Sequence, residues 1–385
     1  MEKFTITLKT VTPVHVWSGN NILPNEYYLD LTTNTFYRID FVKLSRHLSI
    51  YQINVLTQTL SKAGALTGDI QKIIQRYLDE VMLYNIKINK EIVTPLSKTS
   101  EPIMEQLRIN GIPTIPASSI KGLFRTALMY YFIKKDRQLF DKVCNSIEES
   151  ISNLLIEISS KNFRQIRKKI KNLAKNTETQ TFKYWVKLNK YYLADIMQFL
   201  IISDPIIHNV NCTIGSIELY ENGKVLAHQL VEIISENSKF IYKGYIKSKE
   251  YNMKNRKYDS YMKFLEKSKK ITLDILRKAL LNYSKDILER DSKRYERIVG
   301  MKDTLLKSLR EKCNEDKVYV RMGYGTGILW KTILGLVQER RIELYNKLCK
   351  IMNNIYGKIW DLKTFKLVEP WKLPIGVVEI SIKEV

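Results

Sequence analysis

The stretch IPASSIKGLFRTALMYY, residues 115–131, determines more of the expected fold than any other part of the chain. Pro116 and Ser118 are typical of a helix entrance, and we expect Ser118 to cap the free N–H groups of the first turn. Apolar residues then recur at spacings of three and four, which is typical of a helix with one buried face. That face consists of Ile120, Leu123, Phe124, Ala127, Leu128 and Tyr131. The sequence therefore predicts a core-packed helix that runs from Ser119 to about Lys135.

The opposite stripe of this helix contains small and positively charged residues, namely Ser118, Lys121, Gly122 and Arg125. A helix N-terminus that offers free N–H donors, a hydroxyl group and two cations favours the binding of phosphate. Gly122 would let a sugar–phosphate backbone approach closely, because it has no side chain. The alternative is an ordinary capped helix with two solvated cations.

A second element reads VYVRMGYGTGILWKTI over residues 318–333. Its first four residues alternate like a strand, and residues 328–338 have helical spacing. The loop between them contains Gly323, Gly325 and Gly327, and Arg321 and Lys331 flank it. A strand, a glycine loop and a helix can cradle an anion, although the spacing fits neither the dinucleotide fingerprint nor the Walker loop. The alternative is a tight turn before a core helix.

The charge of the chain indicates what kind of partner it has. Its 385 residues include 63 Lys and Arg against 40 Asp and Glu, a formal net charge of +23, and 44% are hydrophobic. This composition excludes a disordered protein and favours a polyanionic partner, with nucleic acid before an anionic membrane. Residues 161–190 contain ten Lys or Arg and one acid, Glu178, so we expect this segment to guide a polyanion electrostatically.

Several kinds of site and segment are not expected. The N-terminal residues show no secretory leader, and the chain has no apolar run long enough to span a membrane. We predict no metal site and no cofactor, because neither the cysteines nor the histidines have ligand spacing. The spacing of the cysteines is typical of free thiols in a reducing cytoplasm. These cysteines and histidines are Cys144, Cys212, Cys313, Cys349, His15, His47, His208 and His228.

The order of the predicted elements favours an α+β fold. Helices are expected at 42–63, 68–84 and 119–135, then with breaks as far as about 198, and again over 258–313; residues 86–115 should be extended. Strands are expected at 3–11, in a hairpin over 27–40, and at 199–205, 213–220, 227–234, 239–246 and 373–382. A turn at Glu221-Asn-Gly-Lys should join two of these strands as a hairpin. This pattern is typical of split β-α-β units with helical insertions.

Three stretches together resemble the RAMP superfamily of CRISPR-associated RNA-binding proteins. They are TPVHVWSG at residues 12–19, IPASSIKGLFR at 115–125 and the glycine loop at 323–327. Their order and the chain length most resemble the Csm-type subunit at the end of type III-A interference complexes, and Cmr-type subunits share the same features. The resemblance implies a ferredoxin-like, RRM-type fold that is assembled from discontinuous segments. It divides the chain into residues 1–248, with helical insertions at about 42–84 and 128–198, and residues 249–385, which contain a helical block and the glycine loop.

The resemblance also implies a function. A protein of this kind would bind near the 3′ end of the single-stranded CRISPR RNA, contact other RAMP subunits and support guide maturation by recruited host nucleases, without cutting RNA itself. Trp17 departs from the small or aliphatic residue often found at its position, and it would either shape a pocket or stack on a base. The positions carried over are His15, Ser18, Gly19, Ser118, Ser119, Lys121, Gly122, Arg125, Gly323, Gly325 and Gly327. We expect the start of the helix at Ser118 and the glycine bend at 323–327 to converge on one RNA-binding groove.

Two other functions remain open at this point. The first is a metal-independent endoribonuclease, in which His15 would be the general base and Lys121 or Arg125 would contact the scissile phosphate. The second is a purely architectural subunit that docks to its partners through helices in residues 42–84 and 258–313.

Overall fold

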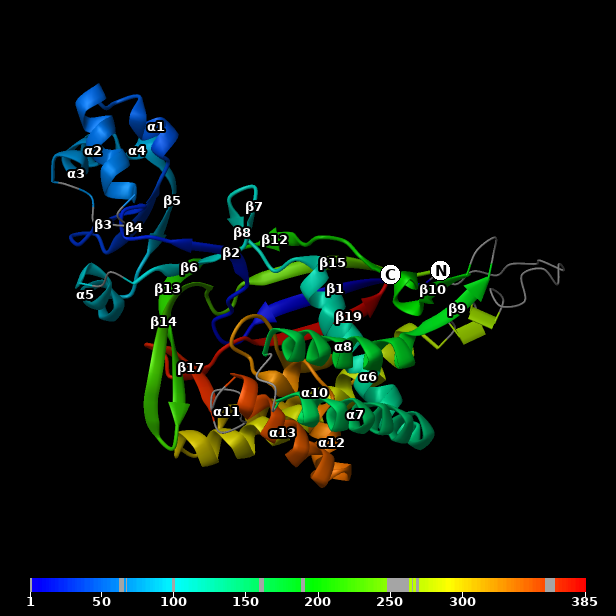
Figure 1. Cartoon of the computed structure of the whole chain (residues 1–385). Helices are drawn as coiled ribbons and strands as arrows, with labels where there is room; N and C mark the ends of the chain where they lie inside the picture. Colours follow the sequence, from blue (N-terminus) through cyan, green and yellow to red (C-terminus); the bar gives the residue numbers. More distant parts are fainter. Residues whose placement is uncertain are drawn as a thin grey trace.

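The computed structural model describes residues 2–61, 66, 68–98, 101–158, 163–187, 191–247, 263–264, 266–267, 270–356 and 364–385. Two large sheets lie next to each other, most of the helices lie on one side of them, and a small unit of strands and helices projects from one end (Figure 1). The predicted α+β class is confirmed, while the ferredoxin-like detail stays a prediction. Part of the predicted 258–313 helical block, and Lys161 and Lys190 of the basic segment, lie outside the described residues.

The central sheet joins strands from both ends of the chain. Its order is β11–β15–β1–β19–β16, with β12 also paired to β15, and every pairing is antiparallel. Residues 1–248 and 249–385 both contribute strands to it, so the two predicted parts share one core. The strands are β1 (Glu2–Thr10), β11 (Leu200–Ile202), β12 (Ile206–His208), β15 (Lys239–Ile246), β16 (Lys317–Arg321) and β19 (Val377–Glu384).

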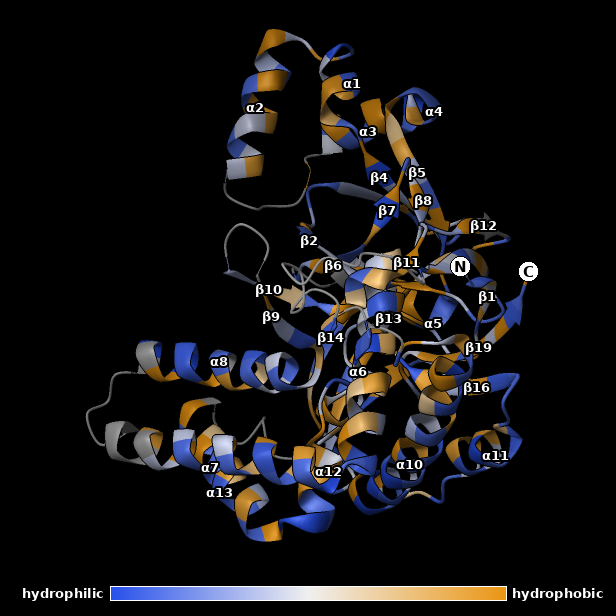
Figure 2. Ribbon diagram, turned by 90° about the vertical axis from the view of Figure 1, so that its right-hand side faces the viewer, coloured by the Kyte–Doolittle hydropathy of each residue, from blue (hydrophilic) through white to orange (hydrophobic). Residues whose placement is uncertain are grey.

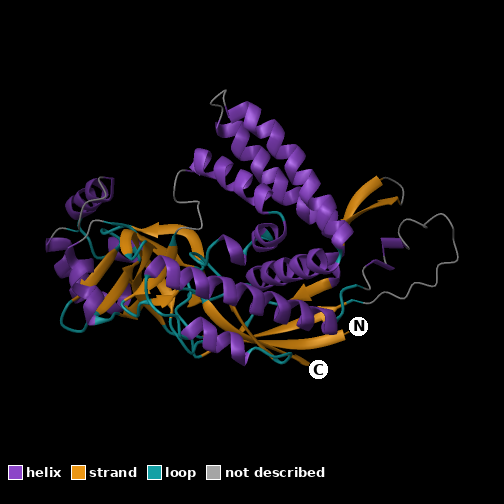
Figure 3. Cartoon of the chain, turned by 90° about the horizontal axis from the view of Figure 1, so that it is seen from below, coloured by secondary structure: helices purple, strands orange, loops and turns teal. Residues whose placement is uncertain are grey.

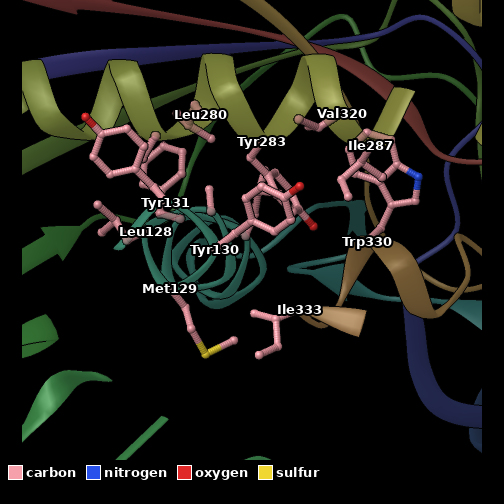
Figure 4. Close-up of a cluster of buried hydrophobic side chains, with 14 of the residues drawn as sticks. Leu128, Met129, Tyr130, Tyr131, Leu280, Tyr283, Ile287, Val320, Trp330 and Ile333 are labelled. Atoms are coloured by element: carbon pink, nitrogen blue, oxygen red, sulfur yellow. The ribbon is translucent and has the colours of Figure 1, made fainter. Parts of the chain in front are cut away.

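Two long helices cover one face of this sheet: α6 (Ala117–Lys135) and α10 (Leu273–Val299). The apolar face predicted for α6 is buried at all of its positions. Figure 4 shows how Tyr130, Tyr283 and Trp330 meet in this core. The rings of Tyr130 and Tyr283 are 5.4 Å apart, those of Tyr283 and Trp330 are 5.7 Å apart, and both pairs are edge-to-face. Such pairs contribute about 0.5–1.5 kcal/mol each beyond the burial of their area.

The second sheet has the order β18–β17–β13–β14–β6–β2. The predicted Glu221-Asn-Gly-Lys hairpin is confirmed, and Asn222 and Gly223 both adopt positive φ angles, which this kind of two-residue turn requires. The strands are β2 (Trp17–Ile22), β6 (Ile103–Gln106), β13 (Cys212–Glu221), β14 (Lys224–Ile234), β17 (Phe365–Glu369) and β18 (Leu373–Pro374). Two short strands, β7 (Arg108–Ile109) and β8 (Ile112–Pro113), form a separate hairpin.

The small projecting unit has its own hydrophobic cluster around Leu44, Ile70 and Ile74. The predicted helix 42–63 is split in two, because Ser49 and Gln52 cap a new helix reciprocally: Ser49 N–H donates to Gln52 Oε1 and Gln52 N–H donates to Ser49 Oγ. The predicted helix 68–84 is also wrong at its end, where residues 82–84 belong to a strand. The elements are β3 (Tyr27–Asp30), β4 (Thr35–Ile39), α1 (Phe41–Ser45), α2 (Ile50–Ser61), α3 (Gly68–Arg76), α4 (Leu78–Val81) and β5 (Met82–Lys87).

Helices α7 (Arg137–Ile158), α8 (Phe163–Phe182) and α13 (Ile342–Tyr356) pack against one another as an arm (Figure 3). The basic segment predicted from the sequence lies mainly on α8, which is largely hydrophilic (Figure 2). Helix was predicted as far as 198, but the chain forms a hairpin instead, with strands β9 (Lys183–Lys187) and β10 (Tyr191–Asp195). The extended segment 86–115 likewise contains an unpredicted helix, α5 (Lys90–Lys98). The remaining elements are η1 (Ile196–Phe199), α11 (Leu305–Lys312), η3 (Ile328–Trp330) and α12 (Leu334–Arg340).

Candidate nucleic-acid interface

A groove with a cavity volume of about 440 Å³ lies where the first loop, helix α6 and the glycine loop meet. The predicted convergence of the helix start and the glycine bend on one groove is therefore confirmed. Seven of the predicted site residues line it: Trp17, Ser119, Gly122, Arg125, Arg321, Gly323 and Lys331.

The glycine loop is fastened to the first loop through the main chain. Tyr324 N–H donates to the carbonyl oxygen of His15 over 2.8 Å. Gly323 has φ +91°, and a Cβ atom at this position would lie 2.4 Å from the same oxygen. Only glycine can make this junction, because any side chain would both strain the backbone and collide with His15. Gly325 and Gly327 also have positive φ, but they lie outside the groove lining.

His15 lies in the interior and not in the groove. Its side chain is fully buried, and Nδ1–H donates to the carbonyl oxygen of Glu232 over 2.6 Å. Nε2 is buried without a hydrogen-bond partner in the described part of the chain. Burial lowers the pKa of His15 to about 4, although the hydrogen bond to Glu232 opposes this shift, so the ring is neutral at pH 7. The side chain of His15 supports the first loop from the interior of the protein. The predictions that His15 contacts RNA and that it acts as a general base are therefore wrong.

The other residues of the first loop differ in their positions. Trp17 lines the groove and is 46% exposed, and its Nε1–H donates to the carbonyl oxygen of Asn20 over 2.7 Å. The indole N–H is thus already bonded, and the ring is left for apolar or stacking contacts. Ser18 and Gly19 lie outside the lining, and Ser18 Oγ–H donates to Glu105 Oε2 over 3.1 Å.

The start of α6 is built differently from the prediction. Pro116 occupies the N-cap position, and Ser118 is exposed and does not line the groove. The N–H group of Ala117 donates to Asp204 Oδ1 over 3.2 Å. The predicted capping by Ser118 is therefore wrong. Because the carboxylate of Asp204 already provides negative charge at this helix N-terminus, the terminus is a poorer site for phosphate than the sequence suggested.

The groove wall next to α6 is balanced by acids. Arg125 Nη2 lies 2.8 Å from Asp195 Oδ2, and Nη1 lies 3.5 Å from Glu178 Oε2. Lys121 lies outside the lining, and burial together with the neighbouring charge of Arg125 lowers its pKa. One guanidinium between two carboxylates has no positive charge to spare for a phosphate.

The wall next to the glycine loop has the opposite character. Arg321 is 2% exposed, and its Nη1 lies 2.7 Å from Asp291 Oδ2. Asp291 also accepts from Trp330 Nε1–H over 2.6 Å and pairs with Arg294 over 2.8 Å. This single carboxylate therefore serves two guanidinium groups, and Arg321 Nη2 has no hydrogen-bond partner in the described ranges. Arg321 is mainly a buried anchor for the strand that leads into the glycine loop, with one donor unused.

Two lysines add to this positive charge. Lys331 lines the groove, and the Nζ atom of Lys366 lies 5.0 Å from the ring centre of Tyr324. Neither lysine forms an ion pair with any residue that the structure describes. Desolvation lowers the pKa of both, and the charge of Arg321 lowers both further, as does Lys331 in the case of Lys366. Ammonium groups whose pKa values are lowered by burial, and further by neighbouring cations, form a site that an anion would stabilise.

Lys366 was missed in the sequence, because the pairing of β17 with β13 brings it beside Tyr324 and it belongs to no motif. Gly122 is exposed on α6, and a Cβ atom there would meet nothing within 4 Å. Internal packing therefore gives no reason for a glycine at this helical position.

The described residues contain no cluster of three or more His, Cys, Asp or Glu side chains that could hold a metal ion. Within the same ranges, none of the helices is long and apolar enough to span a membrane.

Comparison with known proteins places this geometry in a family. The model of the RAMP superfamily matches residues 7–330. One chain of the cryo-EM structure of a Csm–crRNA–target RNA ternary complex from a type III-A CRISPR-Cas system superposes with a TM-score of 0.67 and 18% identity, covering 99% of this chain and 100% of that one. The crystal structure of T. onnurineus Csm5 superposes with a TM-score of 0.60 and 17% identity, covering 97% and 99%.

At these identities the likeness to the solved structures concerns the fold. A sequence search of curated proteins returns no match. The family model, however, covers most of the residues, including all three groove-forming stretches. The chain belongs to the RAMP superfamily.

Proposed function

We propose that this chain is a non-catalytic, RNA-binding subunit of a type III-A CRISPR interference complex. Its groove binds single-stranded CRISPR RNA near the 3′ end, and the subunit supports guide maturation and the assembly of the complex with other RAMP subunits. One observation carries the proposal: Lys331, which lines one wall of a groove formed by three separate stretches, and Lys366, which lies beside Tyr324 of that wall, have no acidic partner among the described residues.

The distribution of charge within the groove supports a phosphate position beside the glycine loop. At the α6 wall, Arg125 is neutralised by two carboxylates. At the glycine-loop wall, Lys331 and Lys366 have no acidic partner in the described part of the chain, and Arg321 has an unused donor. A phosphate is therefore stabilised beside the glycine loop.

Two features supply contacts for the rest of a nucleotide. Gly122 leaves open space on the α6 wall for a sugar–phosphate backbone. Trp17 and Tyr324 also line the groove, and aromatic rings at such positions can stack on unpaired bases. Contacts of this kind position a strand without reading its sequence.

Two further points support a role without catalysis in a Csm-type complex. Among the described residues, no histidine lines the groove, and His15 is buried behind it. One of the structures that shares this fold is a Csm complex with crRNA and target RNA.

The test is the salt dependence of binding to single-stranded RNA. Replacing both Lys331 and Lys366 by Gln should weaken binding and reduce the slope of log K against log salt by roughly 1.4, because each phosphate contact on a single strand contributes about 0.7. The matched control replaces Lys43 and Lys72, two exposed lysines of the projecting unit, by Gln. A folded groove variant that binds like the control would refute the groove assignment.

The same RNA, incubated with the protein in EDTA over a range of pH values, should remain intact. Cleavage at defined positions would instead support the endoribonuclease. If the wild type binds RNA no more tightly than an unrelated, equally basic protein does, the result would support the architectural role instead.

A further inference from the structure

The face of the central sheet that α6 and α10 leave uncovered carries an unusual concentration of lysine. Strand alternation places the buried residues Phe4, Ile6 and Leu8 of β1 on the helix side. The alternate residues of β1, from Lys3 to Lys9, therefore point to the opposite face, together with the residues of β15 and β19 that pair with them. Five of these are exposed lysines: Lys3, Lys9, Lys239, Lys243 and Lys383.

These five lysines are here called the sheet lysines. None of them forms an ion pair with a residue that the structure describes. A sixth lysine, Lys317, is paired with Glu379 over 3.2 Å, and Tyr319 Oη–H also donates to Glu379. Glu379 is the single carboxylate that the register places on this face within the described strands. Six lysines against one glutamate leave a formal excess of five positive charges.

The register brings some of these lysines directly next to each other. Lys9 of β1 is opposite Lys239 of β15 on one side and opposite Glu379 of β19 on the other. Thr5 of β1 lies between Lys243 and Lys383, so that three neighbouring strands form a row with a lysine at each end. Neighbouring strands are about 4.8 Å apart, and like charges directly opposite destabilise a sheet. The neighbouring lysines therefore reduce the stability of the folded sheet.

The usual structural reason for lysines on a sheet does not apply. Lysine often protects an edge strand against pairing with another chain. The sheet lysines, however, lie on β1, β15 and β19, each of which has a neighbour on both sides, and only Lys383 lies beyond the residues of β19 that pair with β16. An external polyanion would explain the charge that the fold leaves uncompensated.

The other side chains on this face indicate which polyanion fits. Thr5, Thr7 and Ser381 offer hydroxyl groups, and the half-buried ring of Tyr245 is opposite Lys3. Lysine is depleted in protein–protein interfaces, whereas hydroxyl groups, cations and an accessible aromatic ring suit a sugar–phosphate backbone with unpaired bases.

We propose that this open sheet face is a second binding surface for single-stranded RNA, separate from the groove. The inference rests on the proposed RNA-binding function. The surface binds phosphates through the sheet lysines and is indifferent to base sequence.

The experiment compares three variants in binding to polyuridine long enough to reach both surfaces. In the sheet variant, Lys9, Lys239 and Lys243 become Gln; the groove variant is the Lys331 and Lys366 double replacement; the control replaces the exposed Lys43, Lys72 and Lys224 by Gln. The sheet variant should reduce the salt slope by roughly 2, if each lysine neutralises one phosphate, and the control should reduce it much less. The Tm of the sheet variant should stay the same or rise, because the replacements remove the like-charged pair of Lys9 and Lys239.

The possible results separate the two proposals. If the groove variant weakens binding and the sheet variant matches the control, the second surface is refuted while the proposed function stands. Wild-type binding that is weak and insensitive to salt would refute both. A sheet variant that binds RNA normally but fails to assemble with its partner subunits would show that this face binds protein, and would also overturn the inference.

A second measurement does not depend on affinity. Polyuridine that contains 4-thiouridine, irradiated with the groove variant, should crosslink to peptides of β1 or β15. Crosslinks to other segments alone would contradict the second surface.

Discussion

Gly122 has two opposing effects, one on stability and one on binding. A glycine within a helix costs roughly 0.5–1 kcal/mol relative to alanine, and here the space for a Cβ atom is open. We therefore expect Gly122→Ala to raise the free energy of unfolding by about that amount while it weakens RNA binding. Thermal denaturation and RNA titration of the same preparation check both halves. An alanine variant that binds RNA as well as the wild type would show that no backbone approaches this position.

His15 should make stability depend on pH. Its pKa in the folded state, about 4, is lower than the usual value of 6.5, so the unfolded chain takes up a proton more readily. The stabilisation is complete above about pH 6.5 and is lost as the pH falls towards 4, and the total loss is on the order of 3 kcal/mol. Urea unfolding at pH 7 and pH 4.5 measures it. His15→Asn should reduce this dependence.

The glycine loop is the element whose geometry is most constrained. Gly323→Ala would place a Cβ atom 2.4 Å from the carbonyl oxygen of His15, at a φ angle that already disfavours side chains. We expect it to destabilise the protein by about 2 kcal/mol or more and to displace Tyr324 from the groove. Gly19→Ala is the matched control, because Gly19 also has a positive φ but open space around it. Its cost should be near the lower limit for such strain, about 1 kcal/mol. Equal losses of unfolding free energy would contradict the role of the clash.

Elements with long, regular patterns could be predicted from the sequence. Helix α6 and the β13–β14 hairpin have such patterns, since one has six apolar positions in helical register and the other has a turn that fits a single geometry. The β9–β10 hairpin could not be predicted in this way. The basic run that precedes it continues a helical pattern into residues that pair with each other as strands.

The site was predictable only in part, for a related reason. The glycines and Lys331 lie in one continuous motif, so their common position could be inferred. Lys366 comes to them through strand pairing, and Asp204 comes to the start of α6 through a loop. Contacts of this kind depend on the tertiary fold and leave no local spacing in the sequence. The acidic balance around Arg125 was hidden in the same way, because Glu178 and Asp195 lie on separate elements.

In the molecule as a whole, the net charge of +23 is distributed unevenly. The α6 wall of the groove is balanced by acids, while the glycine-loop wall and the open sheet face are not. These two surfaces belong to one rigid core, because β16, which leads into the glycine loop, pairs with β19 of the central sheet. A strand of RNA bound in the groove and one bound on the sheet would thus be held at a fixed distance from each other.

The position of β1 has a consequence for biosynthesis. Its two neighbours, β15 and β19, are translated long after it, and β19 comes last. A nascent chain therefore carries β1 with an unpaired edge until β19 has left the ribosome. Chains that end before this point would expose the edge of β1 that normally pairs with β19, with Phe4, Ile6 and Leu8 on one face of the strand.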